Sequence, residues 1–244
     1  PTSNGVWTYA NNVYTFSTSA DNATILYTEL QTYLRNYSVE IKTARVSGTQ
    51  VGSVVFEVGL DVVKNSSISS ALVFMVTSGG GVQFNHSLSL RNPNYFYYPG
   101  YNLVVNTGGT VFVGAVLNLS GFSNGGGNTS MPAPGTVSMV IGGDFLVSGL
   151  GQVLSKGIEN TYNGNGNGGP GGLQSYVVSG RIDLQAGSVL NAGGGHAFNT
   201  ISYLTQGGAG GSITMSGVNG VMMRGTVMSM GGNARSGGTG GALS

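Results

Sequence analysis

The hydrophobic residues of this chain fall in short, strand-length runs that alternate with polar residues and end at glycine. In residues 53–63 (SVVFEVGLDVV), the β-branched side chains and the alternation favour a strand over a helix. Residues 22–34 differ, because Ile25, Leu26, Leu30 and Leu34 recur at helical spacing. The pattern predicts an all-β chain that contains one short helix near its N-terminus.

A five-residue motif, Gly-x-Val-(Leu/Met)-(Asn/Ser), occurs four times. It begins at Gly114, Gly151, Gly187 and Gly225, so the gaps are 37, 36 and 38 residues. Three glycine-rich segments also end alike, at residues 168–172, 207–211 and 237–241. A regular period of this length is typical of a solenoid, in which each repeat buries its apolar face against its neighbours.

Short strands separated by glycine corners predict a parallel β-helix with repeats of about 37 residues. We expect the motif valines to form one interior column, and the last motif residues to form a polar ladder beside it. The column is Val116, Val153, Val189 and Val227, and the ladder is Asn118, Ser155, Asn191 and Ser229. The alternative is a β-sandwich, which explains the short strands but not the repeat.

Charge divides the chain into two regions. Ten of its 17 charged residues lie within residues 1–91, and the remainder is richer in glycine. We therefore predict an N-terminal β-rich capping region over residues 1–100 and glycine-rich β-helix repeats over residues 101–244. Residues 22–34 are the candidate cap on one open end of the solenoid.

Composition excludes several classes of protein. Charged residues make up 7% of the chain and the net charge is +1, so we expect no nucleic-acid partner. No apolar run approaches the roughly 18–20 residues of a membrane-spanning helix, so we expect no transmembrane segment. The absence of cysteine excludes disulfides.

Six Asn-x-Ser/Thr sequons are candidates for glycosylation. They are Asn22, Asn36, Asn65, Asn85, Asn118 and Asn128. Because glycosylated sequons occur in secreted proteins, they favour an extracellular or cell-surface location. The start at Pro1 without methionine suits a processed or cropped chain.

Several segments resemble known surface proteins. Residues 24–34 (TILYTELQTYL), residues 38–43 (SVEIKT), residues 81–85 (GVQFN) and the repeated motif resemble the β-helical repeats of filamentous-haemagglutinin-like secreted adhesins. That resemblance implies an extracellular, non-enzymatic scaffold used for adhesion or surface display. The composition is also similar to that of glycosylated, cysteine-free archaeal surface filaments, whose subunits join by lending a strand to a neighbour.

Few residues suggest catalysis or metal binding. His86 and His196 have no clustered Cys, His or Asp near them in the sequence, so we expect no metal and no cofactor. Asp144 and Asp183 fall near equivalent corners of successive repeats. They are the one carboxylate pair that a polysaccharide-cleaving enzyme would use, and the alternative is that both are exposed corner residues.

The densest aromatic cluster in the sequence is Tyr95, Phe96, Tyr97, Tyr98 and Tyr101. These side chains would either contact sugars or a partner subunit, or pack between the two predicted regions.

The sequence therefore predicts a non-enzymatic, extracellular structural or adhesive surface protein built as a β-solenoid. The alternatives are a subunit of a glycosylated filament that assembles by end-stacking or strand donation, and a polysaccharide-active β-helix enzyme. The last repeat is followed by no evident cap, so the expected partners are a second copy, the continuation of a longer solenoid, or surface glycans.

Overall fold

The computed structural model describes residues 2–20, 22–43, 52–92, 99–121, 134–160, 167–197, 206–233 and 241–244. Within these residues the chain is all-β apart from one helix, α1 (Tyr27–Asn36). It begins with an antiparallel hairpin of β1 (Gly5–Ala10) and β2 (Val13–Thr18). The turn residues Asn11 and Asn12 have φ of 52° and 62°. Positive φ at both positions is typical of the type I′ turn that matches the twist of a hairpin.

Three sheets follow, and their strands are related by the repeat. The first sheet continues from the hairpin through β3 (Ser38–Lys42), β6 (Val73–Ser78), β9 (Asn102–Thr107), β12 (Thr136–Ile141), β15 (Leu173–Val178), β18 (Ser212–Gly217) and β21 (Ala242–Leu243). The second contains β4 (Val54–Phe56), β7 (Val82–Phe84), β10 (Val111–Val113), β13 (Phe145–Val147), β16 (Ile182–Leu184) and β19 (Val221–Met223). The third contains β5 (Leu60–Val63), β8 (Leu88–Arg91), β11 (Val116–Asn118), β14 (Gln152–Leu154), β17 (Val189–Asn191) and β20 (Thr226–Met228).

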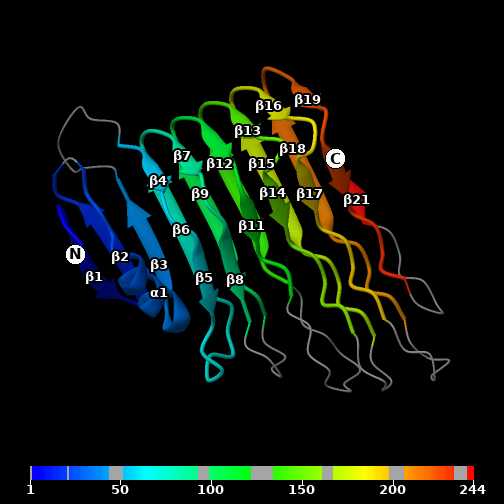
Figure 1. Ribbon diagram of the computed structural model, residues 1–244, viewed down its shortest axis with the longest axis horizontal. Helices are drawn as coiled ribbons and strands as arrows, with labels where there is room; N and C mark the ends of the chain where they lie inside the picture. Colours follow the sequence, from blue (N-terminus) through cyan, green and yellow to red (C-terminus); the bar gives the residue numbers. More distant parts are fainter. Residues whose placement is uncertain are drawn as a thin grey trace.

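From β3 to β20 the chain visits the first, second and third sheets in turn, so each repeat is a triplet of strands. Each strand pairs in parallel with its counterpart in the next triplet, and the triplets advance side by side (Figure 1). Parallel pairing of the named strands after the hairpin is compatible with a β-helix, whereas a Greek-key sandwich needs antiparallel sheets. The pairing of β6 with β9 carries the first sheet across residue 100 without a break.

Alternation within each strand builds the core. In the second sheet, the first and third residues of each strand point inward and the middle residue points outward. The inward residues Val82, Val111, Phe145 and Ile182 form one column, and Phe84, Val113, Val147 and Leu184 form the next. All eight are fully buried, so each triplet covers the apolar side chains of the one before it.

The predicted valine column in the third sheet is wrong for two of its four members. Leu117, Val153 and Leu190 are paired and fully buried, whereas Val116 and Val189 are half-buried. The motif glycine lies two residues before β11 and β17 but one residue before β14 and β20. Because side chains alternate between faces, this one-residue shift exchanges the inward residue of each strand.

The same shift divides the predicted polar ladder. Asn118 and Asn191 are half-buried and outward-facing, while Ser155 and Ser229 are buried. Asn118 Oδ1 accepts a hydrogen bond from Ser120 N at 3.0 Å, and Asn191 Oδ1 accepts one from Gly193 N at 2.8 Å. These asparagines therefore stabilise equivalent turns in alternate triplets rather than forming one ladder with the serines.

The predicted helix is confirmed, with bounds shifted a few residues toward the C-terminus. Leu30 and Leu34 are its buried residues, and α1 packs against β3 and β5 beside the N-terminal hairpin (Figure 1). The Tyr101 hydroxyl donates to Leu34 O at 2.9 Å and links α1 to the chain that enters β9. Within the described residues, no helix has the length and apolarity needed to cross a membrane.

Candidate functional site

The most unusual feature of the structure is a layer of glycine-rich arms beside the three sheets. In each repeat, one arm leaves the third sheet and a second arm returns to the first sheet (Figure 1). We call residues 155–160, 192–197 and 229–233 the outgoing arms, and residues 167–172 and 206–211 the returning arms. They contain the glycine-rich segments that the sequence placed between coils, and they are outside the strands of all three sheets.

Hydrogen bonds join the arms in more than one direction. Along the outgoing arms, Gly157 N donates to Gly193 O and Asn160 N donates to His196 O, both at 2.8 Å. Along the returning arms, Gly168 N donates to Gln206 O and Gly171 N donates to Ala209 O, also at 2.8 Å. The donors recur at every third residue, which is the period of an extended polyproline-II-type helix.

Bonds also connect outgoing to returning arms. Gly169 N donates to Ile158 O and Gly172 N donates to Ser155 O, again three residues apart. In the next repeat, Gly208 N donates to Gly195 O and completes the same pattern. Backbone groups of neighbouring arms therefore satisfy one another's hydrogen bonds.

Close approach of backbones explains why these positions are glycine. A Cβ atom at Gly195 would overlap the carbonyl oxygen of Ile158, and one at Gly208 would overlap that of Gly169. Collagen has the same requirement at its crowded axis, where only glycine fits.

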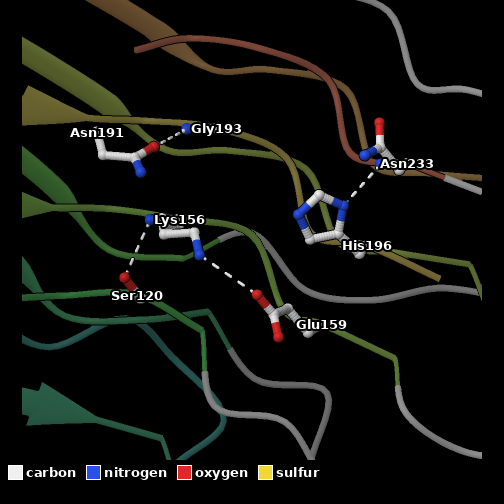
Figure 2. A network of polar contacts seen from close by, with 7 residues as sticks. All are labelled: Ser120, Lys156, Glu159, Asn191, Gly193, His196 and Asn233. Carbon is white, nitrogen blue, oxygen red and sulfur yellow. Dashed lines mark hydrogen bonds and ion pairs between the residues drawn. The ribbon is translucent and has the colours of Figure 1, made fainter. Parts of the chain in front are cut away.

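Polar side chains decorate the outgoing arms, as Figure 2 shows. Lys156 Nζ lies 3.3 Å from Glu159 Oε1 in a half-buried ion pair, and Lys156 N donates to Ser120 Oγ at 3.1 Å. His196 Nδ1 accepts a hydrogen bond from Asn233 N at 2.8 Å in the adjacent arm. The bonds to Ser120 and from Asn233 connect successive repeats, whereas the ion pair lies within one arm. No cluster of metal-ligating side chains occurs in the part of the chain that the structure describes.

The two candidate catalytic carboxylates are not at equivalent positions. Asp144 precedes β13, and its Oδ1 accepts from Arg181 N at 2.7 Å in the next triplet. Asp183 lies within β16, is 8% exposed, and forms an ion pair with Arg224 at 2.8 Å. Because Asp183 pairs in register with Leu146, the two carboxylates are offset by two strand positions. Each carboxylate holds its own triplet to the following one.

The sequon asparagines are spread over the surface. Asn22, Asn65 and Asn85 are exposed, while Asn36 and Asn118 are half-buried; Asn128 lies outside the described residues. Asn65 Nδ2 donates to Asn36 Oδ1 at 2.9 Å, and Asn65 Oδ1 accepts from its own sequon residue Ser67 at 3.1 Å. The side chains of these two sequon asparagines therefore contact each other across the surface.

Of the predicted aromatic patch, Tyr101 is fully buried and belongs to the core. Burial raises its pKa well above that of an exposed tyrosine. Tyr95, Phe96, Tyr97 and Tyr98 lie outside the described residues.

The structure instead assembles an aromatic cluster from the hairpin, α1 and the residue that caps the C-terminus of α1. Its members are Trp7, Tyr9, Tyr14, Phe16, Tyr33 and Tyr37, each in ring contact with another. The alternation of aromatic residues in residues 6–9 and 13–16 was the sequence signal for it, because cross-strand pairs of a two-residue hairpin lie on one face.

A second unpredicted feature is Lys64, which is 1% exposed at the end of β5. Its Nζ donates to Pro99 O at 2.8 Å and Ser70 O at 3.1 Å. Loss of hydration lowers its pKa to about 8.

The lowered pKa of Lys64 predicts that the free energy of unfolding rises with pH. Between about pH 8 and pH 10 the unfolded chain binds the Lys64 proton more strongly than the folded chain, so the free energy of unfolding should increase. Above pH 10 the buried Tyr101 and Tyr176, whose pKa values are raised, should reverse the trend as the unfolded tyrosines ionise. Urea denaturation at several pH values measures this. Lys64→Met should abolish the rise, and an unchanged rise in that variant would contradict the assignment.

Comparisons with known proteins give no relative, because no protein-family model, no curated protein and no solved structure matches the chain. The function therefore has to be inferred from the geometry alone.

Proposed function

We propose that the chain is a non-enzymatic structural and adhesive protein of the cell surface, built as a closed β-solenoid. The observation that carries the proposal is the continuous hydrogen-bonded stack, in which three sheets and a glycine-arm layer repeat along the described residues. Such a stack is a rigid, extended scaffold.

Contacts between sheets support closure of the solenoid around one interior. The rings of Phe145, in the second sheet, and Tyr176, in the first, stack 4.7 Å apart. Gln174 of the first sheet is 1% exposed, and its Nε2 lies 3.1 Å from Val153 O in the third. The Tyr176 hydroxyl donates to Gln174 Oε1 at 2.9 Å. Inward residues of all three sheets thus share one core.

The contacts that Asp144 and Asp183 make favour a structural over an enzymatic role. Asp144 is bound to the backbone of Arg181, and Asp183 is paired with Arg224. General acid–base hydrolysis of a glycosidic bond needs two carboxyl groups facing one substrate. The polysaccharide-enzyme alternative has no further support from the described residues.

The surface chemistry favours an extracellular location. Three Asn-x-Ser/Thr sequons, at Asn22, Asn65 and Asn85, have an exposed asparagine, and glycosylated sequons occur in secreted proteins. Treating intact cells of the source with a protease tests the location. We expect this chain to be cleaved while an internal marker protein survives, and protection of the chain until lysis would contradict the proposal.

The filament alternative is supported by one observation at the last triplet. Val221 and Met223 are 44% and 59% exposed, although their counterparts Ile182 and Leu184 in the preceding triplet are fully buried. Among the described residues, β19 is the outermost strand of the second sheet, and its core-type side chains are of the kind that a second copy of the chain would cover.

A charged substitution in β19 tests self-association through this edge. We expect the chain to sediment as oligomers and Met223→Glu to shift it toward the 24.8 kDa monomer, because a charge cannot be buried cheaply. Val140→Glu is the matched control, since Val140 is 51% exposed on the outer face of the first sheet, away from this edge. A monomeric parent chain in analytical ultracentrifugation would rule out the filament alternative.

A further inference from the structure

The N-terminal aromatic cluster contains an exposed ring, Tyr9, in addition to rings that pack into the core. Tyr14 and Tyr33 stack with centroids 4.0 Å apart, and Trp7 lies edge-on to Tyr33 at 4.8 Å. Phe16 is 1% exposed, so it belongs to the core like the other inward residues of the first sheet. Tyr9 is 51% exposed although it occupies the same face of the hairpin.

Neighbouring rings fix the position of Tyr9. Its ring lies 4.6 Å from that of Tyr14 and 5.4 Å from that of Tyr37. The Tyr9 hydroxyl donates to Asn12 Oδ1 at 2.8 Å, which restrains the other end of the side chain. A half-exposed ring that is held in this way has already lost its rotational freedom, so binding a ligand costs little further entropy.

Polar groups surround the rings on two sides. Asn11 and Asn12 are exposed at the hairpin turn, and their amides are able to donate and accept hydrogen bonds. On the α1 side, Glu29 Oε1 lies 3.5 Å from the Tyr33 hydroxyl. Burial and the Glu29 charge raise the Tyr33 pKa, so this hydroxyl remains a donor. The carboxylate disfavours an anionic ligand at the same place.

We propose that the aromatic cluster at the hairpin and α1 is a binding site for a neutral saccharide. The apolar face of a sugar ring packs on Tyr9, and its hydroxyl groups bond to Asn11 and Asn12. Aromatic surface with a few placed polar groups is the usual composition of a small-ligand site. The inference deepens the adhesive role proposed above and rests on it, because it supplies the class of ligand.

The cluster carries its own reporter, since Trp7 is the one tryptophan of the chain. Titration of the full chain with cellohexaose, chitohexaose and maltohexaose, followed by Trp7 emission and by calorimetry, tests the site. We expect saturable binding of at least one of the three. Tyr9→Ala should weaken that binding by about tenfold or more. Tyr27→Ala is the matched control, because Tyr27 is 42% exposed on α1 and should keep the affinity within about twofold.

Two results would overturn the inference. One is the absence of saturable binding to all three hexasaccharides, and the other is equal affinity of the parent and Tyr9→Ala chains. Circular dichroism establishes that each variant is folded. The location experiment separates the two proposals: a chain that is cleaved on intact cells but binds no saccharide loses only this inference, whereas one that binds but is protected in cells loses the surface role.

Discussion

Replacing Gly195 by alanine should destabilise the chain by about 3 kcal/mol or more, or prevent folding. The added Cβ would overlap the carbonyl oxygen of Ile158, which is backbone and has no rotamer to move. Relief would require separating two arms that are hydrogen-bonded to their neighbours. Chemical denaturation followed by circular dichroism measures the change in the free energy of unfolding.

Gly59→Ala is the control for the glycine prediction. At Gly59 the nearest atom to a new Cβ is Ser87 O at 3.6 Å, which is an ordinary contact. We expect that variant to stay within about 1 kcal/mol of the parent. If Gly195→Ala were as stable as Gly59→Ala, the arms would not pack as described.

The second large effect concerns the strand register in the third sheet. Leu190→Asn should lower the free energy of unfolding by about 3 kcal/mol or more. Leu190 is fully buried between Val153 and Val227, and an amide in that apolar column would lack hydrogen-bond partners. Val189→Asn, one residue earlier and half-buried on the outer side, should cost no more than about 1 kcal/mol.

The paired variants test the correction to the sequence motif directly. The stability of both variants is measured from the midpoint of urea unfolding, and the same slope is assumed for both. A larger loss for Val189→Asn than for Leu190→Asn would restore the motif valines to the interior and contradict the observed pairing.

Much of the fold was predictable from the spacing of the motif. Four occurrences at nearly constant distance indicated that equivalent strands stack, and the parallel pairing of β11, β14 and β17 agrees with this. The helix was predictable because Leu30 and Leu34 lie one turn apart and both needed burial.

The register was not predictable from the motif, because the side of a strand changes with every residue. The motif glycine at Gly151 lies one residue closer to its strand than that at Gly114 does, and no feature of the five letters reveals this difference. Corners that vary in length are ordinary in a solenoid, and only the pairing across strands fixes which residue points inward.

The hydrogen-bonded layer of glycine arms is the largest feature that the sequence did not predict. Residues 155–160 and 167–172 suggested corners or excursions, since glycine in a sequence normally indicates conformational freedom. Here Gly195 and Gly208 are needed for space instead, and that requirement depends on arms one repeat away along the chain. The recurrence of glycine at intervals of three, as at Gly168 and Gly171, was the available signal.

The candidate site shows a similar limit. The densest aromatic segment in the sequence contributed a core residue, Tyr101, whereas the exposed cluster came from residues 7 to 37 brought together by a hairpin and a helix. Local density of a residue type does not determine exposure, because the contacts that bury a side chain are distant in sequence.

The central claim is that arms and sheets form one continuous hydrogen-bonded scaffold, and amide hydrogen exchange tests it most directly. The amides of Gly169, Gly195 and Gly208, which donate to neighbouring arms, should be protected to the same degree as those of strands β9 and β12. Exchange of these arm amides at the rate of an unstructured peptide, while the strands remain protected, would contradict the account.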